Sequence, residues 1–219
     1  MSRVRAGVER SIRSVMEDRI KKLSKDIDLL YEIGCLRFIK RSWQNYLGPD
    51  VANLAEHHFR VAWLSLVIAQ YENVKNTDKI MKMALIHDLA ESRTGDANWY
   101  QKKYLQHFDE KAIEDILRGS AFEDEFKKLW QEYVERKSIE SKIVRDADQL
   151  DAEFEIKEQS IRGYQFPKEW KKVRAEVFET FHTKAAKKIW DRLQKSDPHH
   201  WHKEPQGSRG QNKDEDKEI

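Results

Sequence analysis

The sequence predicts an all-α protein, and the scarcity of helix breakers is the first observation behind this prediction. No proline lies between Pro49 and Pro167, and only Gly95, Gly119 and Gly163 interrupt that stretch. Glu, Lys, Ala and Leu, which favour helices, are frequent in it. The second observation is that apolar residues recur every three or four positions, while alternation typical of strands is absent. This spacing is seen at Leu54, Val61, Leu64, Ile68, Ile80, Ala84, Ile139, Ile143, Leu150 and Phe154.

The individual helices follow from these patterns in chain order. Gly34 is placed to end the first helix as its C-terminal cap. Thr77 or Asp78 is placed to cap one later helix at its N-terminus, and Asp109 another. Helices are expected at about 9–33, 36–41, 54–72, 77–92, 98–107, 109–117, 122–135, 139–162 and 168–194, with a loop at 43–53.

The chain is predicted to divide into three segments. Residues 1–34 form an amphipathic helix that is expected to pack on the domain, and residues 35–195 form the folded domain. From residue 196 onward only Trp201 and Ile219 are bulky and apolar. Such a composition buries too little apolar surface to fold, so 196–219 is predicted to be a disordered tail. The chain contains no internal repeat and no lasting heptad pattern.

The composition excludes several classes of protein. The 219 residues carry 41 Lys+Arg against 39 Asp+Glu, a balance that argues against a nucleic-acid-binding protein. No run approaches the roughly 20 apolar residues of a membrane span, and the N-terminus lacks the apolar centre of a secretory signal. The single cysteine, Cys35, rules out internal disulfides and is expected to be a small core residue. We therefore expect a cytoplasmic protein that binds neither nucleic acid nor membrane.

Two histidines and three acidic residues are candidates for chemistry. His57 extends the apolar stripe of its predicted helix, and His87 continues the stripe of the next one, so both are expected to point into the bundle. Asp88 follows in the apolar run MALIHDLAES, where an unpaired carboxylate would be costly to bury. Glu91 stands four residues after His87, which predicts that both share one helix face. Asp96 adds a further carboxylate.

A later predicted helix carries a second acidic group. The run IVRDADQLDAEFE places Asp146, Asp148 and Asp151 in one helix. Inward imidazoles and carboxylates need a counter-charge, and two neutral imidazoles with two carboxylates balance one divalent cation. Mixed imidazole and carboxylate ligands suit Mn, Fe, Co, Ni or Zn better than Mg or Ca. The set that gives this balance is His57, His87, Asp88 and Asp148.

Four stretches of the chain resemble a known family. The order His57, His87-Asp88, Asp148 is similar to the H…HD…D signature of the HD-domain metal-dependent phosphohydrolases. The segments AEHHFRVA, IHDLAESRTGD and VRDADQLD resemble helices of its small 5'-deoxynucleotidase subgroup, over about residues 36–162. The resemblance implies an HD-domain helical bundle at 35–195. It also implies an enzyme that hydrolyses deoxyribonucleoside 5'-monophosphates to deoxynucleoside and phosphate.

The resemblance further implies the roles of individual residues around one divalent metal ion. Glu91 matches the glutamate that handles the proton of the attacking water. Asp96 matches an aspartate of the metal–water network. The matching metal ligands are His57, His87, Asp88 and Asp148.

The same resemblance points to a phosphate-binding position before the first ligand. Trp43 lies fourteen residues ahead of His57, as in the family, and either Arg41 or Lys40 is expected to meet the substrate phosphate. His58 stands where the family has a serine. The family also implies a homodimer.

Two other functions stay open at the level of sequence. One is an HD hydrolase that acts on another nucleotide: an alarmone, a cyclic nucleotide or a nucleoside triphosphate. The other is a regulatory protein whose site holds nucleotide or metal without turnover. The retention of Glu91 argues against the second, because an idle site has no need of a base.

Overall fold

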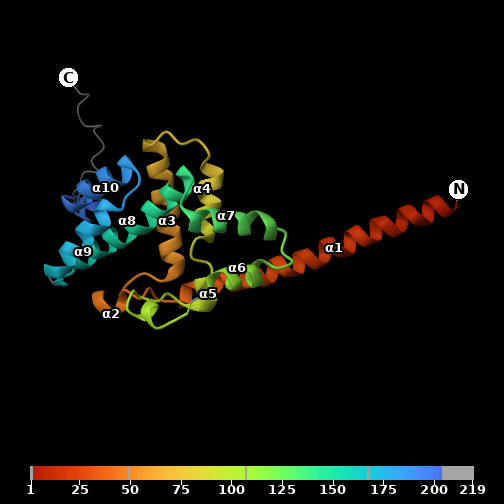
Figure 1. Ribbon diagram of the computed structural model, residues 1–219, viewed down its shortest axis with the longest axis horizontal. Coiled ribbons are helices and arrows are strands. Elements are labelled where there is room, and N and C mark those ends of the chain that lie inside the picture. The colour runs from red at the N-terminus through yellow and green to blue at the C-terminus, as the bar shows by residue number, and fades with distance from the viewer. Residues whose placement is uncertain (1, 49, 107, 167, 204–219) are drawn as a thin grey trace, which may run out of the picture.

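The computed structural model describes residues 2–48, 50–106, 108–166 and 168–203, and over these residues the protein is helical with no strand (Figure 1). The all-α prediction is therefore confirmed. Three 3₁₀ turns at Leu36–Phe38, Gln101–Lys103 and His200–His202 accompany the α-helices. The α-helices are α1 Ser2–Cys35, α2 Gln44–Leu47, α3 Leu54–Tyr71, α4 Thr77–Ile86, α5 Glu91–Thr94, α6 Asp109–Leu117, α7 Glu123–Glu135, α8 Ile139–Ile161, α9 Lys168–Glu179 and α10 Lys184–Gln194.

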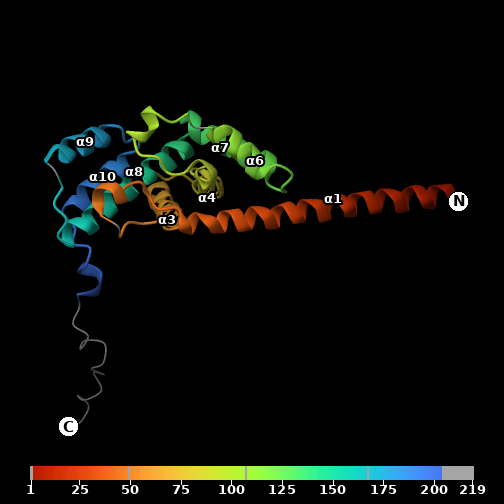
Figure 2. The ribbon, with the colours of Figure 1, turned by 90° about the horizontal axis from the view of Figure 1, so that it is seen from below.

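Helices α3 and α8 form the centre of the bundle. They lie against each other, and α4, α7 and α10 pack around them (Figures 1 and 2). The apolar stripes predicted from the sequence meet here, with Val61 and Ile68 of α3 and Ile143 and Leu150 of α8 completely buried. Each such side chain stabilises the fold by roughly 1.5–3 kcal/mol on burial. This core holds the two helices that carry the candidate ligands His57 and Asp148.

The N-terminal caps fix where the central helices begin. The Asn53 side chain accepts a hydrogen bond from the Glu56 N–H, and the Glu56 carboxylate accepts one from the Asn53 N–H, which makes a reciprocal capping box for α3. The cap of α4 is Asn76, which accepts from the Lys79 N–H. The sequence-based choice of Thr77 or Asp78 was wrong by one or two residues, because the Asn76 side-chain amide already satisfies the Lys79 donor.

The helix predicted at 77–92 is broken at the candidate site. Helix α4 ends at Ile86, and α5 begins only at Glu91. The turn between them is held by backbone hydrogen bonds between residues three apart, from the Leu89 N–H to the Ile86 carbonyl and from the Glu91 N–H to the Asp88 carbonyl. His87 and Glu91 therefore do not share one helix, and their relative placement is set by the turn.

Three other segments also differ from the predicted helices. In the segment predicted as a helix at 98–107, the described part holds only the Gln101–Lys103 3₁₀ turn, and His107 lies outside the described residues. Asp109 is the first residue of α6 rather than its cap, and its carboxylate accepts a hydrogen bond from the Thr94 hydroxyl at 2.9 Å. The loop expected at 43–53 contains the short helix α2.

The helix predicted at 168–194 is divided in two. Thr183 caps α10 by accepting a hydrogen bond from the Ala186 N–H. The buried Asp146 of α8 accepts hydrogen bonds from the backbone N–H groups of His182 and Thr183. Because these bonds pin the chain between α9 and α10 to the bundle, the two helices are separate.

Helix α1 reaches the bundle only near its C-terminal end. It continues through Gly34 to Cys35, so Gly34 is not a cap, and Cys35 is exposed rather than a core residue as predicted. The Glu32 carboxylate accepts two hydrogen bonds from Arg93, at 2.6 and 2.8 Å, which tie α1 to α5. The N-terminal part of the helix projects away from the bundle (Figures 1 and 2).

The tail is described only in part. Residues 200–202 form a 3₁₀ turn, and residues 204–219 of the predicted disordered tail lie outside the described residues. The domain limits at 34/35 and 195/196 stay predictions. Within the described ranges, no helix is long and apolar enough to cross a membrane.

Candidate metal centre

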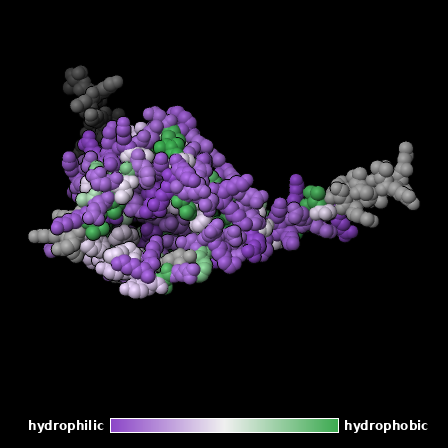
Figure 3. Space-filling view, in the orientation of Figure 1, coloured by the Kyte–Doolittle hydropathy of each residue, from purple (hydrophilic) through white to green (hydrophobic). Residues whose placement is uncertain are grey.

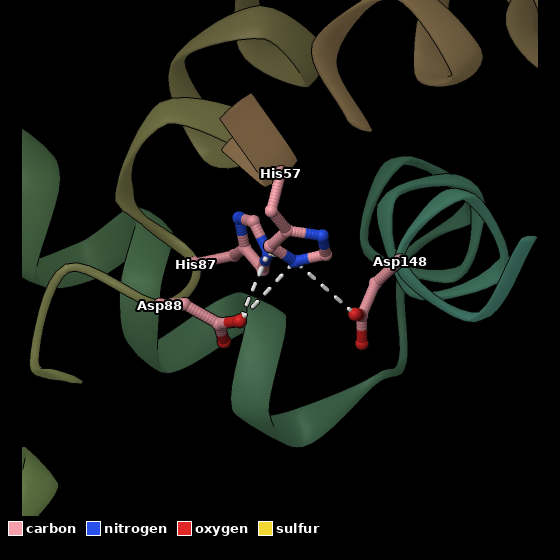
Figure 4. Close-up of side chains that lie close together, drawn as sticks. All are labelled: His57, His87, Asp88 and Asp148. Carbon is pink, nitrogen blue, oxygen red and sulfur yellow. Dashed lines mark hydrogen bonds and ion pairs between the residues drawn. The ribbon is translucent and has the colours of Figure 1, made fainter. Parts of the chain in front are cut away.

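Four side chains from three segments of the bundle converge on one point (Figure 4). His57 comes from α3, His87 and Asp88 from the turn after α4, and Asp148 from α8. One potential ligand atom of each lies within 4.8 Å of the others. His57 Nε2 is 3.5 Å from both Asp88 Oδ2 and Asp148 Oδ1, and His87 Nε2 is 3.3 Å from Asp88 Oδ2. The structure thus brings together the four residues that the sequence analysis proposed as ligands.

The outer nitrogen of each imidazole is held by an acceptor. His57 Nδ1 donates to Asp151 Oδ2 at 2.6 Å, and His87 Nδ1 donates to the Ala84 carbonyl at 2.8 Å. The second oxygen of the Asp151 carboxylate, Oδ1, pairs with Arg60 Nε at 3.0 Å. These partners turn both Nε2 atoms toward the carboxylates, which is the orientation that metal-binding imidazoles need. Asp151 had no assigned role in the sequence analysis, but its position three residues after Asp148 on α8 could have suggested one.

The charged groups at the centre shift one another's pKa values. Burial and the charge of the nearby Arg41 lower the pKa of His57, but its contacts with Asp151 and Asp88 outweigh both and raise that pKa to about 9. Burial raises the pKa of Asp88, and the neighbouring His87 and His57 more than reverse this, so the pKa lies well below its ordinary value. A proton on His57 Nε2 and a metal ion use the same lone pair and therefore compete for this site.

The donors fit a divalent cation. Two imidazole nitrogens and two carboxylate oxygens lie within one small volume, and a charge of +2 offsets the two carboxylates. Nitrogen and oxygen donors together suit Mn, Fe, Co, Ni or Zn.

Glu91 faces the same centre from α5. Its Oε2 atom is buried and makes no hydrogen bond within the described part of the chain. Burial, together with the charges of Asp88 and Asp96, raises the pKa of Glu91 to about 10. A carboxyl group with a buried oxygen atom that has no hydrogen-bond partner, beside a cluster of ligands, is typical of a group that exchanges protons.

Arg41 links two acidic residues at the mouth of the centre. Its Nη1 is 3.4 Å from Asp88 Oδ2 and its Nε is 3.3 Å from Asp96 Oδ2. Asp96 also accepts a hydrogen bond from the Ser42 N–H at 3.0 Å, which fixes the turn that carries Arg41. Lys40 instead donates to the Val51 carbonyl at 3.5 Å and lines a different cavity. Of the two cations left open by the sequence, only Arg41 lies in this site.

A cavity of about 300 Å³ opens over the centre. Besides acidic residues, it is lined by the cations Arg41, Lys102 and Arg145 and by the aromatic residues Trp43, Tyr46 and Trp99. Arg145 forms an ion pair with Asp148 Oδ2 at 2.6 Å. Sequence analysis did not single out Arg145, although it precedes Asp148 by three residues and therefore shares its face of α8. Lys102 and Tyr46 lie in the segments 98–107 and 43–53, whose local structure the sequence predicted wrongly.

His58 lies beside the centre without joining it. Its ring packs on that of His87, with 4.6 Å between the centroids, and its Nε2 is buried without a hydrogen-bond partner among the described residues. Burial, together with the adjacent His87, lowers the pKa of His58 well below its ordinary value, so the ring is neutral. His58 therefore supports His87 by packing.

The fold is an all-helical domain, and the site is a His/Asp cluster between its central helices. Fold and site together define the class of protein. Residues 33–193 match the HD domain family, and the chain belongs to that family. The similarity found from the motifs is thereby confirmed, and so is the helical bundle that it implied.

Named relatives are similar over most of the domain. The chain is 30% identical over 162 residues to 5'-deoxynucleotidase HDDC2 of Dictyostelium discoideum, a match that covers 67% of this chain and 80% of the relative. It is 29% identical to human 5'-deoxynucleotidase HDDC2, over 57% of this chain and 63% of the relative. A conserved hypothetical protein from Pyrococcus furiosus has a similar structure, with a TM-score of 0.65 and 26% identity over 78% of this chain and 99% of that one.

Proposed function

We propose that the protein is a metal-dependent 5'-deoxynucleotidase, which hydrolyses deoxyribonucleoside 5'-monophosphates to deoxynucleoside and phosphate. The observation that carries this proposal is the cluster of two histidines and two aspartates beneath a cavity of about 300 Å³. A cavity of this volume suits a small molecule. The activity named for the relatives from Dictyostelium discoideum and Homo sapiens supports the same reaction.

The four clustered residues would hold one divalent ion, with Mn, Co, Fe, Ni and Zn as the candidates. When bound, such an ion polarises a phosphoryl oxygen and the attacking water, and its charge lowers the pKa of the nearby Glu91. His57 and His87 are already oriented for this task by Asp151 and the Ala84 carbonyl. The cluster consists of His57, His87, Asp88 and Asp148.

Glu91 and Arg41 would act on the reacting groups. As the water oxygen bonds to phosphorus, the bond from phosphorus to the 5'-oxygen breaks. Glu91 takes the proton of the water and passes it to the departing 5'-oxygen. The guanidinium of Arg41, held between Asp88 and Asp96, donates to the non-bridging phosphate oxygens. Asp96 is therefore a positioning residue, and no covalent enzyme intermediate is needed.

The nucleoside would lie against the aromatic side of the cavity. Trp43 and Tyr46 line it, and each packs edge-on against Trp170, with ring centroids 5.8 and 5.5 Å apart. Rings held in this way offer a fixed apolar surface to a sugar or base. We accordingly propose that Trp43 contacts the substrate.

The test is phosphate release from a panel of nucleotides. The protein is treated with chelator and reloaded with one metal. It is then supplied separately with deoxyribonucleoside monophosphates, ribonucleoside monophosphates, an alarmone, a cyclic nucleotide and a triphosphate. We expect release from the deoxy-monophosphates, lost in His87→Ala and Asp148→Ala and kept in the exposed controls His199→Ala and Asp50→Asn. Equal activity on a different nucleotide class, or full activity in His87→Ala, would refute the proposal.

A comparison of Glu91→Gln with the native protein separates an enzyme from a binding protein. Loss of a general base lowers the rate by about 10²–10⁴-fold, so a large drop is expected in Glu91→Gln. Equal and negligible turnover in both proteins would instead favour a site that binds without reaction.

We also propose that the enzyme is a cytoplasmic homodimer. The family resemblance supports the dimer, and a single free cysteine is consistent with a reducing compartment. Localisation of the tagged full chain and its mass in solution test the two statements separately.

A further inference from the structure

Helix α1 is long and has few contacts with its own chain. Its 34 residues span about 51 Å. Among the described residues, the hydrogen bonds between α1 and the rest of the chain come from Asp26, which accepts from the Ala121 N–H, and from Glu32. The ion pairs nearer the N-terminus, such as Arg13–Glu17, lie within the helix. Because most helical stability in proteins comes from tertiary packing, such a helix is expected to have a partner.

An apolar stripe runs along the projecting helix. Its five members follow one another at steps of four, three, four and three residues, and each is between 46 and 66% exposed. This is the spacing of the seam of a coiled coil. Figure 3 shows apolar atoms on the projecting part of the helix, where the surrounding surface is hydrophilic. The members are Met16, Ile20, Leu23, Ile27 and Leu30.

We propose that α1 pairs with the α1 of a second copy of this chain as an antiparallel coiled coil. In this register Ile20 packs against the partner's Leu23, and Met16 against the partner's Ile27. A two-fold axis then makes the same patch serve both copies, as an isologous interface requires.

The charges beside the stripe select this register. Arg19 and Asp26 occupy equivalent positions next to the seam, one heptad apart. In the antiparallel register Arg19 faces the partner's Asp26, and symmetry repeats the pair. A shift by one heptad would place Asp26 against the partner's Asp26. A parallel pair would place Arg19 against the partner's Ser24, with no charge complementarity. Opposite charges across an interface fix orientation and register.

An apolar groove extends the stripe onto the domain. It has a volume of about 410 Å³ and is lined by Leu30 and Ile33 of α1 and by Phe59, Leu85 and Phe122 of the bundle. Leu30 belongs to both the stripe and the groove. In the antiparallel register Leu30 lies opposite the partner's Arg13, so the partner helix passes the mouth of the groove. Contiguous exposed apolar surface of this kind marks an interaction site.

The mass of the full chain in solution tests the pairing. We expect Ile20→Asp/Leu23→Asp to raise the dissociation constant by about 100-fold or more, because carboxylates at the seam have to be desolvated. Ser14→Asp/Lys21→Asp adds two aspartates on the opposite face of α1 and is expected to leave the mass unchanged. Circular dichroism checks that both variants remain folded. A native chain and an Ile20→Asp/Leu23→Asp variant of equal mass would overturn the proposal, whatever the catalytic activity.

Engineered cysteines test the orientation in a Cys35→Ser background. Mixed Met16→Cys and Ile27→Cys proteins are expected to form a disulfide with each other, because these positions are opposite in the antiparallel register. Met16→Cys alone is expected to form none, since the two copies of residue 16 are then about 16 Å apart along the axis. Rapid cross-linking of Met16→Cys alone would overturn the register. A monomeric chain that binds anionic phospholipid vesicles through α1 would overturn the pairing itself.

Discussion

Replacement of Asp151 by asparagine tests whether the centre depends on a carboxylate outside the cluster. Asp151 Oδ2 accepts from His57 Nδ1 at 2.6 Å, and the Asp151 side chain is only 3% exposed. An amide at this place can present its NH₂ group to Nδ1, which moves the imidazole proton to Nε2. Because Nε2 faces Asp88 and Asp148, a proton there removes the lone pair that would bind a metal.

The expected effect of Asp151→Asn is a metal dissociation constant about 10- to 100-fold higher. This corresponds to about 1.4–2.7 kcal/mol. A hydrogen bond to a charged group contributes about 1.5–3 kcal/mol, which is the same range. Competition with a chelator measures the affinity for manganese or cobalt, and phosphate release from a deoxy-monophosphate measures the activity.

Asp50→Asn is the matched control, because the Asp50 side chain is 82% exposed and lies away from the cluster. Thermal unfolding in chelator shows whether each variant keeps its fold. If the folded Asp151→Asn protein has a metal dissociation constant within twofold of that of the native chain, metal binding does not depend on the orientation of His57 by Asp151. The same conclusion follows if Asp50→Asn loses as much affinity.

Three further predictions concern stability. Manganese or cobalt at about 100 times its dissociation constant is expected to raise the melting temperature by about 5–10 °C in a thermal scan, with no shift in His87→Ala. Asn53→Ala removes the capping box of α3 and is expected to lower the free energy of unfolding, measured with urea, by about 1 kcal/mol. Asn45→Ala, at an exposed position, is expected to leave it unchanged. The hydrogen bonds from Arg93 lower the pKa of Glu32, despite an opposing contribution from burial. Glu32→Gln should therefore cost up to about 1 kcal/mol above pH 4.5, and this difference should vanish as the pH falls through the lowered pKa of Glu32; a constant difference would contradict it.

The helices of the core follow from the sequence because their signal is local. Helix α8 begins at Ile139 and ends one residue before the predicted limit, and α6 matches its prediction from Asp109 to Leu117. Each apolar stripe needs only the 3.6-residue period and a cap to be recognised. The break after Ile86 was missed because the apolar pattern continues through the turn, although the backbone does not.

The candidate ligands were also accessible from the sequence. An aspartate or histidine within an apolar stripe has to be buried and needs a counter-charge, so composition and spacing mark it as a candidate. The resemblance to the HD-domain family implied the same four residues as metal ligands. The choice between Arg41 and Lys40 was not accessible in this way. The two residues are adjacent, and only the turn held by Asp96 sends Arg41 into the cavity while Lys40 faces the Val51 carbonyl.

The sequence by itself determined the helical class, the central helices and the inward polar residues that became candidates. The reason is that the local pattern shows which face of a helix is buried and which polar side chains would be costly to bury there. The tertiary structure alone decided which atoms meet. It placed Asp151 behind His57 and Arg145 beside Asp148, and it left the stripe of α1 in solvent. The physical reason is that periodicity assigns a residue to a face of its helix, whereas the neighbour of that face depends on how distant helices pack.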